Sequence, residues 1–175
     1  MLDLAICPLR PGDLPDGLQF DTMLPGRNVL AAREGHPLLH GHAVTAADLQ
    51  QFPWIAPPAN SPLHADLQRV LSTIEAEKIR VSFFGGSLSA VMGMLVGSDS
   101  LTVLPYSVLF TLRRRYHVAA LSIRIEHPDR SLGLFYLRNA PLRPAARRMR
   151  SFILAQFETL AATLQHHERQ SLWRR

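Results

Sequence analysis

The segment from Val81 to Pro105 constrains the fold of this chain more than any other part of the sequence. Val81 to Phe84 is a short β-branched and aromatic run, which is typical of a strand, and Gly85-Gly86 permits a tight turn. Ser87 is a favoured helix cap, and the helical pattern that follows it leads into a second apolar run at 101–104. The segment therefore predicts a strand, a glycine turn, a helix and a second strand.

The predicted turn has the features of an anion-binding site. The first N–H groups of a helix have no partner within the helix, and the helix dipole places partial positive charge there. Anions therefore bind readily where a glycine turn leads from a strand into a helix. A plain connection between two elements has the same sequence, so both interpretations of Gly85, Gly86 and Ser87 stay open.

Composition places the chain among ordinary globular proteins. Of its 175 residues, 47% are hydrophobic and 19% are charged, which suits one sizeable core or two small lobes. No apolar run reaches the roughly 18 residues of a membrane helix, and the start Met-Leu-Asp-Leu does not resemble a signal peptide. The single cysteine, Cys7, allows no internal disulfide and no metal-ligand spacing. We therefore expect a cytoplasmic protein with no membrane partner and no cofactor.

The positive charge is concentrated at the C-terminal end of the chain. The formal net charge is +5, and residues 143–175 carry seven arginines against Glu158 and Glu168, whereas the remainder is neutral. A basic segment can bind polyanions, but this one has no interleaved aromatic residues, zinc-ligand spacing or recognition-helix pattern. We favour a solvated helix face over a nucleic-acid site.

Strand and helix patterns alternate along the chain. Leu2 to Cys7 is nearly all apolar, as expected of a strand covered on both faces of a parallel sheet, and Pro8 ends it. Gly93 lies inside a predicted helix, where only a close neighbour would explain a glycine. Further strands are predicted at 28–33, 79–84, 118–125 and 132–138, and helices at 61–78, 87–96, 105–115 and from Pro144 onward. This alternation predicts an α/β fold with a largely parallel sheet, in which ligands bind beyond the carboxyl ends of the strands.

The sequence contains no catalytic or metal-binding constellation. Its eight histidines are scattered, without a helical i, i+4 pair beside a carboxylate. His40 and His42 lie in a polar loop and would form a weak metal site at most. Cys7 follows an apolar run, so it is either a nucleophile or, as we prefer, a buried thiol. Phosphate loops, nucleophile elbows and dinucleotide fingerprints are absent, which favours a binding protein over an enzyme.

A series of short motifs occurs in the order that is found in one known family. The motifs are Leu2-Asp3-Leu4-Ala5-Ile6, the run Val29 to Leu38 with Gly-His-Pro-Leu at its end, Asp48-Leu49 followed by Pro53-Trp54-Ile55 and Ser61, the helix that ends at Val96, Leu101-Thr102-Val103-Leu104-Pro105, and Pro-Ala-Ala at 144–146. Over nearly its whole length, the chain resembles the effector-binding domain of LysR-type transcriptional regulators. It departs from the family pattern at Gly97-Ser98-Asp99-Ser100, where the family has two glycines before the last strand.

The resemblance implies a fold similar to type 2 periplasmic binding proteins, with two Rossmann-like lobes and a mostly parallel sheet. The first lobe is expected to be incomplete at its N-terminal side, and the winged helix-turn-helix of the family is missing. Residues 1–36 would then be a remnant of the first lobe, 37–138 the second lobe, and 139–175 a C-terminal helix that returns to the first lobe and ends in a basic tail.

The resemblance also implies effector contacts in a cleft between the lobes. The second lobe would contribute Pro57, Asn60, Ser61, Phe84, Gly85, Gly86 and Ser87, and the first lobe would contribute Cys7 and Pro8. The two serines head predicted helices and can offer hydroxyl and N–H groups to a carboxylate, while Phe84 and Pro57 supply apolar walls. Ser61 fits a plain helix cap equally well.

Two functions follow from these expectations. In the first, the chain is a dimerising or tetrameric regulatory domain that senses a small molecule, an organic acid in our interpretation. It would reach DNA only through a winged helix-turn-helix absent from this chain. In the second, the cleft is incomplete and binds nothing, and the chain serves as an oligomerisation module. Neither function makes or breaks a bond.

Overall fold

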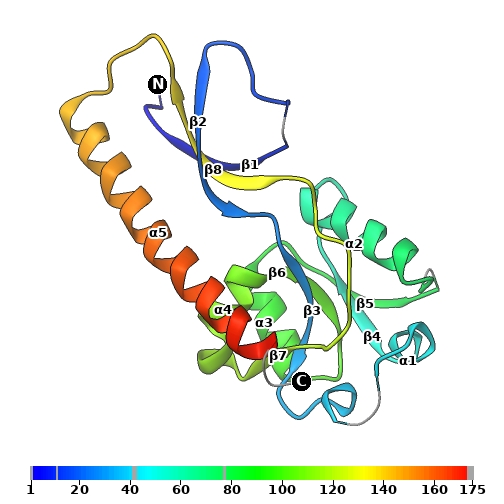
Figure 1. Cartoon of the computed structure of the whole chain (residues 1–175). Coiled ribbons are helices and arrows are strands. Elements are labelled where there is room, and N and C mark those ends of the chain that lie inside the picture. The colour runs from blue at the N-terminus through cyan, green and yellow to red at the C-terminus, as the bar shows by residue number, and fades with distance from the viewer. Residues whose placement is uncertain (1, 11, 41–42, 77, 173–175) are drawn as a thin grey trace. The chain divides into compact units, whose positions relative to one another are not determined.

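The computed structural model describes residues 2–10, 12–40, 43–76 and 78–172, and it consists of two compact units (Figure 1). Unit 1 comprises Met1–Gly26 and Asp129–Arg175, and unit 2 comprises Arg27–Pro128. The chain passes from unit 1 to unit 2 after Gly26 and returns to unit 1 after Pro128. Both passages lie earlier in the chain than the divisions at 36/37 and 138/139 that are expected from the sequence. The reason is strand pairing, because β3 (Asn28–Arg33) pairs within unit 2 and β8 (Ser131–Leu137) pairs within unit 1.

Unit 2 is built on five strands. The strand β3 lies between β6 (Thr102–Pro105) and β7 (Val118–Ala120) and is antiparallel to both. The strands β4 (Pro53–Ala56) and β5 (Arg80–Phe84) are parallel neighbours, and a parallel bridge between Trp54 and Leu101 joins β4 to the start of β6. The carboxyl ends of β4, β5 and β6 therefore lie at one edge.

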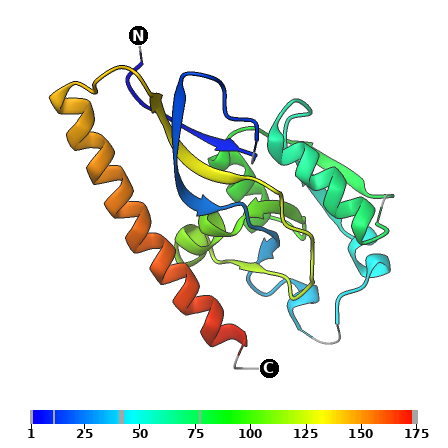
Figure 2. The same cartoon turned by 45° about the horizontal axis from the view of Figure 1, so that its top comes forward.

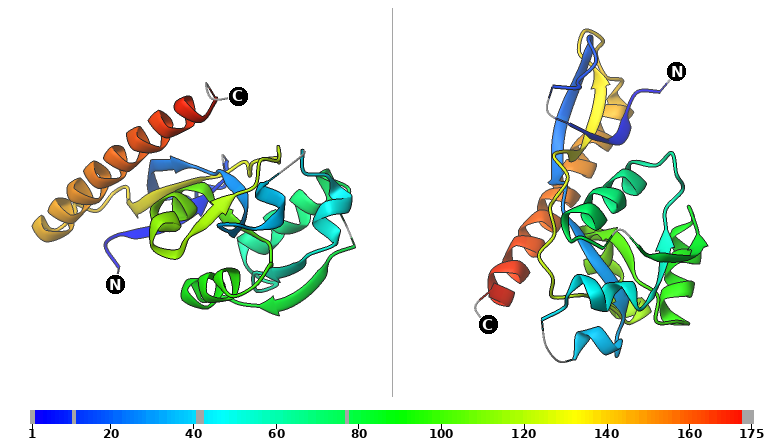
Figure 3. Two further views of the ribbon diagram at one scale, coloured as in Figure 1. Left: turned by 90° about the horizontal axis from the view of Figure 1, so that it is seen from below. Right: turned by 90° about the vertical axis from the view of Figure 1, so that its right-hand side faces the viewer.

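Helices cover both faces of these strands (Figure 1, Figure 3). The helices α1 (Ala46–Gln50) and α2 (Pro62–Thr73) pack on one face, and α3 (Leu88–Val96) and α4 (Tyr106–Tyr116) pack on the other. Successive side chains of β4 alternate between the faces, with Trp54 and Ala56 in the α2 cluster and Ile55 in the α3 cluster. A short 3-10 helix, η1 (Pro37–Leu39), follows β3.

The start of α2 agrees with the sequence prediction, whereas its end at Thr73 lies before the predicted end at residue 78. Ser61 caps it and Pro62 occupies its first turn, a combination that suits the unpaired N–H groups at a helix start. Leu67, Val70 and Leu71 are buried on its inner face. Leu63 and Ile74 pack against the same cluster.

Gly93 lacks the close neighbour that the sequence led us to expect. It is exposed, and a Cβ atom built on it meets no heavy atom within 4 Å. We therefore expect Gly93→Ala to raise the free energy of unfolding by about 1 kcal/mol, because glycine loses more backbone entropy than alanine in a helix. Urea denaturation measures the change. Gly97→Ala is the control, since its Cβ would lie 3.3 Å from the Gly93 carbonyl oxygen; a loss of stability in Gly93→Ala as large as that in Gly97→Ala would contradict the prediction.

Unit 1 consists of an antiparallel sheet and one long helix. The sheet has the order β1-β8-β2, with β1 at Ala5–Leu9 and β2 at Leu18–Pro25. The helix α5 (Pro144–Leu172) runs beside β2 (Figure 2). Arg150 fastens it there, because its Nε donates to Asp21 of β2 at 2.8 Å and its Nη2 donates to the Tyr136 hydroxyl of β8 at 3.2 Å.

The prediction for the first strand was wrong in its limits and in its surroundings. The strand β1 begins at Ala5, continues through Pro8, and is largely exposed instead of covered on both faces. Cys7 is exposed as well, so the expected buried thiol is not found. As the edge strand of the sheet, β1 tolerates a proline, whose missing N–H need not enter the ladder.

The expected parallel arrangement is confined to β4, β5 and β6, and the other strand pairs are antiparallel. Parallel neighbours need a crossover connection, usually a helix. The helices α2 and α3 supply such crossovers in unit 2, whereas β1 and β2 follow each other without a helix between them. The predicted strand at 118–125 is also shorter, since β7 ends at Ala120. Within the described ranges, no helix combines the length and apolar character that a bilayer crossing requires.

Candidate functional site

Two loops meet where β4 and β5 end. Ala56 and Phe84 are paired, and the Gly85 N–H donates to the Ala56 carbonyl at 3.1 Å. A Cβ atom on Gly86 would lie 3.1 Å from Cγ of Pro58, so glycine permits the close approach of the loops. We call residues 57–61 and 84–87 the edge loops. They contain seven of the nine residues expected to bind an effector: Pro57, Asn60, Ser61, Phe84, Gly85, Gly86 and Ser87.

Ser61 is fully engaged as a helix cap. Its Oγ accepts the His64 N–H at 3.2 Å and donates to the Pro58 carbonyl at 2.8 Å. The helix-cap interpretation left open by the sequence therefore describes what Ser61 does in this structure. Its hydroxyl would have to give up one of these bonds to donate to a ligand.

Ser87 differs from Ser61 although it holds the same position at the start of α3. It makes no side-chain cap hydrogen bond, it is exposed, and its hydroxyl lies 2.9 Å from that of Ser89. The first intrahelical N–H is that of Val91, which donates to the Ser87 carbonyl at 3.0 Å. The N–H groups of residues 88–90 precede it, so the start of α3 offers donors that no side-chain cap occupies.

The edge loops and the first turn of α2 also carry apolar and imidazole groups. Phe84 is 65% exposed, whereas Pro57 is buried. The Pro57 carbonyl lies 3.1 Å from Nδ1 of His64, and because a carbonyl only accepts, Nδ1 carries the proton. The sequence analysis did not single out His64, yet its position three residues after the cap Ser61 places it in the first turn of α2 at the same edge.

Cys7 and Pro8, the two remaining expected contacts, belong to unit 1. Both are exposed on β1, where Cys7 is opposite Gly133 of β8. Of the two histidines considered as a weak metal site, His40 is exposed and His42 lies outside the described residues. Among the residues the structure describes, no group of three His, Cys, Asp or Glu side chains is placed to hold a metal ion.

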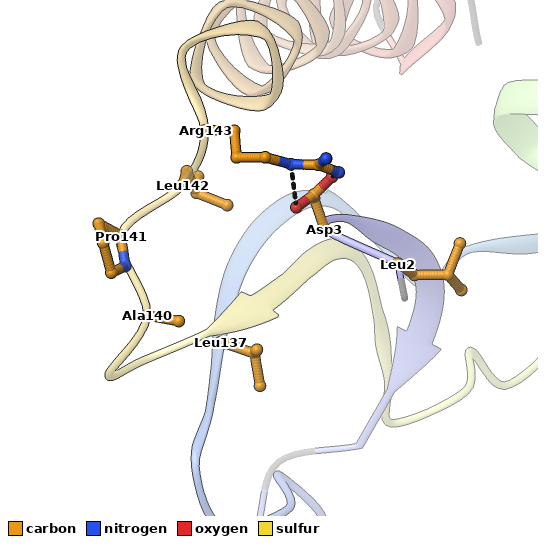
Figure 4. A pocket seen from close by; sticks show the side chains of 7 residues that line it. All are labelled: Leu2, Asp3, Leu137, Ala140, Pro141, Leu142 and Arg143. Carbon is orange, nitrogen blue, oxygen red and sulfur yellow. Dashed lines mark hydrogen bonds and ion pairs between the residues drawn. The ribbon is translucent and has the colours of Figure 1, made fainter.

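Unit 1 also contains a cavity of about 310 Å³ that includes none of the expected contacts (Figure 4). Asp3 and Arg143 lie next to each other in its wall and form an ion pair. The hydrogen bond from Arg143 holds the pKa of the Asp3 carboxyl below its usual value. The charged groups of this cavity therefore satisfy each other. Its other lining residues are Leu2, Leu137, Ala140, Pro141 and Leu142.

His36 is the one fully buried histidine among the described residues. Its Nδ1 accepts the Leu38 N–H at 3.1 Å, its Nε2 lies 3.2 Å from the Asp99 carbonyl, and its ring packs on Phe52. Burial lowers the pKa of the imidazole, which outweighs the opposing effect of the Asp99 carbonyl. These contacts fit a neutral ring with its proton on Nε2.

Unit 2 is therefore expected to lose stability in acid through His36. The folded state binds a proton at His36 less readily than the unfolded state does. The stabilisation from the neutral ring is therefore complete above pH 6.5 and declines as the pH falls below it. One such group gives a slope of at most about 1.4 kcal/mol per pH unit. Urea denaturation between pH 7.5 and 5, compared with His36→Gln, measures it. An equal decline in both proteins would contradict this role of His36.

The comparisons with known proteins agree with this architecture. The family model of the LysR substrate binding domain matches residues 1–158. The chain belongs to this family. Among curated relatives, the LysR-domain sequence is 27% identical to the transcriptional regulator GalR of Pseudomonas putida over 83% of this chain and 36% of that protein. It is 27% identical to the transcriptional regulator GbpR of Azospirillum brasilense, over 91% of this chain and 47% of that protein.

Solved structures confirm the fold of the LysR domain. The effector binding domain of QuiR in complex with shikimate matches with a TM-score of 0.62 and 21% identity, over 90% of this chain and 72% of that one. The fold class expected from the sequence, an α/β fold of the type 2 periplasmic-binding-protein kind, is thus confirmed. The family consists of bacterial transcriptional regulators whose effector-binding domain corresponds to this chain. The LysR domain spans between a third and a half of the curated relatives it matches.

Proposed function

We propose that this LysR effector-binding domain senses a small organic acid, and that the edge loops of unit 2 bind its carboxylate. The observation that carries the proposal is the junction of the two loops at the carboxyl ends of β4 and β5, where the start of α3 has no side-chain cap. Ligands of open α/β sheets bind at such edges, and helix starts favour anions. In this family, the effector domain of QuiR was solved with shikimate, which is a carboxylate.

The carboxylate would accept hydrogen bonds from the N–H groups of Leu88 and Ser89 and from the hydroxyl of Ser87. Phe84 would cover the apolar part of the ligand, and Nε2 of His64 would accept a hydrogen bond from a hydroxyl of the ligand. No bond is made or broken in the ligand.

Sensing requires that the ligand bind one arrangement of the two lobes more tightly than another. A ligand with equal affinity for both arrangements would not shift the equilibrium between them. Units 1 and 2 would act as these lobes. The signal would reach DNA through a winged helix-turn-helix of the regulator, and the protein would act in the cytoplasm, where the DNA is.

Isothermal titration calorimetry with a panel of small carboxylates, beginning with shikimate, tests the proposal. We expect one member to bind, its methyl ester to bind far more weakly, and both Ser87→Ala and Phe84→Ala to reduce the affinity. Ser151→Ala, on an exposed position of α5, is the matched control and should leave the affinity unchanged. A carboxylate that binds equally well to the Ser61→Ala, Ser87→Ala and Phe84→Ala variants would overturn the site assignment.

We also propose that the domain dimerises, because both units have exposed apolar surface. In unit 2, residues 85–98 carry no charged side chain, and Leu88, Met94 and Val96 of α3 are exposed. In the described part of unit 1, the exposed large apolar side chains are Leu2, Ile6, Leu137, Met149 and Phe152. Where such side chains form a contiguous patch, a partner usually covers it.

These surfaces also support the second candidate function, an oligomerisation module that binds no ligand. Both extended core clusters described in the structure lie within unit 2, whereas unit 1 has several large apolar side chains exposed. Light scattering coupled to size exclusion separates the candidates. A monomer would contradict both dimerisation and the module, and a dimer that binds no carboxylate would favour the module over sensing.

A further inference from the structure

A buried polar pair links the candidate effector site to the point where the chain enters unit 2. Asn28, the first residue of β3, is 2% exposed, and Asp66 of α2 is 4% exposed. The Asn28 side-chain amide donates to Asp66 Oδ2 at 2.8 Å. A hydrogen bond to a buried carboxylate contributes more than one between neutral groups, and an unpaired buried carboxylate is costly. The pair therefore fixes α2 relative to the start of β3.

Each end of this pair is close in sequence to a functional feature. Asp66 follows the first turn of α2, which Ser61 caps and which carries His64 at the edge loops. Asn28 follows Arg27, the first residue of unit 2 after the crossing from unit 1. The Arg27 carbonyl accepts the Tyr106 N–H at 2.7 Å, so the crossing is also tied to the first residue of α4.

We propose that Asn28 is a positioning residue that couples the first turn of α2 to the crossing between the units. A displacement of this turn moves Asp66, and Asn28 passes the displacement to Arg27 and thus to its bond with Tyr106. This inference rests on the proposed function, because the coupling would carry the signal of an effector bound at the edge loops. It assigns no ligand contact to Asn28 or Asp66.

A ligand-free experiment on the full chain tests the coupling. Ser61→Ala removes the cap of α2, and the exchange rate of the Tyr106 amide hydrogen, measured by NMR, reports on the crossing. We expect Ser61→Ala to accelerate this exchange about fivefold, the effect of losing one side-chain cap. In an Asn28→Ala background, adding Ser61→Ala should cause no further change in the exchange rate of the Tyr106 amide hydrogen.

Asp66→Asn is the conservative control, because its amide oxygen still accepts from Asn28 and the effect of Ser61→Ala should persist. If Asn28→Ala alone does not fold, Asn28→Ala/Asp66→Ala replaces it, since the double variant removes the buried carboxylate together with its Asn28 donor. Equal acceleration with and without Asn28, or none in the parent protein, would overturn the coupling. Failure of every carboxylate to bind would overturn the proposed function and leave this result unaffected.

Discussion

Replacing Trp54 by alanine is expected to remove about 3–5 kcal/mol of stability, a large share of the 5–15 kcal/mol that is typical of a folded domain. Trp54 is completely buried in β4, at the centre of the cluster formed with α1 and α2. Its Nε1 donates to the Leu49 carbonyl of α1 at 3.0 Å. The substitution therefore leaves a large cavity and an unpaired buried carbonyl.

Urea denaturation followed by circular dichroism measures the loss of stability without relying on tryptophan fluorescence. Trp54→Phe keeps most of the apolar contact and loses only the hydrogen bond, so it should cost about 1–2 kcal/mol. Phe84→Ala, at a site that is 65% exposed at the end of β5, is the control for removing an aromatic ring. A loss in Trp54→Ala no greater than that in Phe84→Ala would contradict the packing described for unit 2.

Ser87→Asp is expected to change stability and carboxylate affinity in opposite directions. An aspartate at the first position before α3 can accept the helix N–H groups that Ser87 leaves uncapped, which should stabilise the fold by about 0.5–1 kcal/mol. The same carboxylate would repel a carboxylate ligand at the edge loops. Two like charges within a few Å cost at least about 1 kcal/mol even in water, so the affinity should fall about fivefold or more.

Thermal denaturation and calorimetry measure the two effects in parallel. Ser151→Asp on α5 carries the same change in net charge at an exposed position of unit 1 and should leave the carboxylate affinity unchanged. Ser61→Asp should gain little stability, because Ser61 already caps α2. If Ser87→Asp stabilised α3 and retained full affinity, the start of α3 would not be the carboxylate site.

Features encoded by neighbouring residues were predictable from the sequence. The start of α2 is one example, since Ser61, Pro62 and the spacing of Leu67, Val70 and Leu71 all act within the helix itself. The glycine turn is another, because Gly85 and Gly86 lie between the end of β5 and the start of α3. Seven of the nine residues that were expected to contact an effector therefore lie together in the edge loops.

Features that depend on distant partners were not predictable. The strand β1 was placed in a buried parallel sheet, but its neighbour β8 lies far away in the sequence and makes it an exposed antiparallel edge. His36 has no local signal for burial, because Phe52 and Asp99 enclose it from other elements. The sequence also did not show that Ser61 caps its helix with its side chain and Ser87 does not, because both are serines at a helix start.

The central claim, a carboxylate site at the edge loops, is tested most directly by titrating isotopically labelled protein with shikimate and with every carboxylate that calorimetry identifies. Two-dimensional NMR then shows which backbone amides change. The proposed function predicts that the largest shifts fall on Gly85, Gly86 and residues 88–90. Shifts that cluster around the Asp3 and Arg143 cavity of unit 1, with residues 85–90 unchanged, would contradict it.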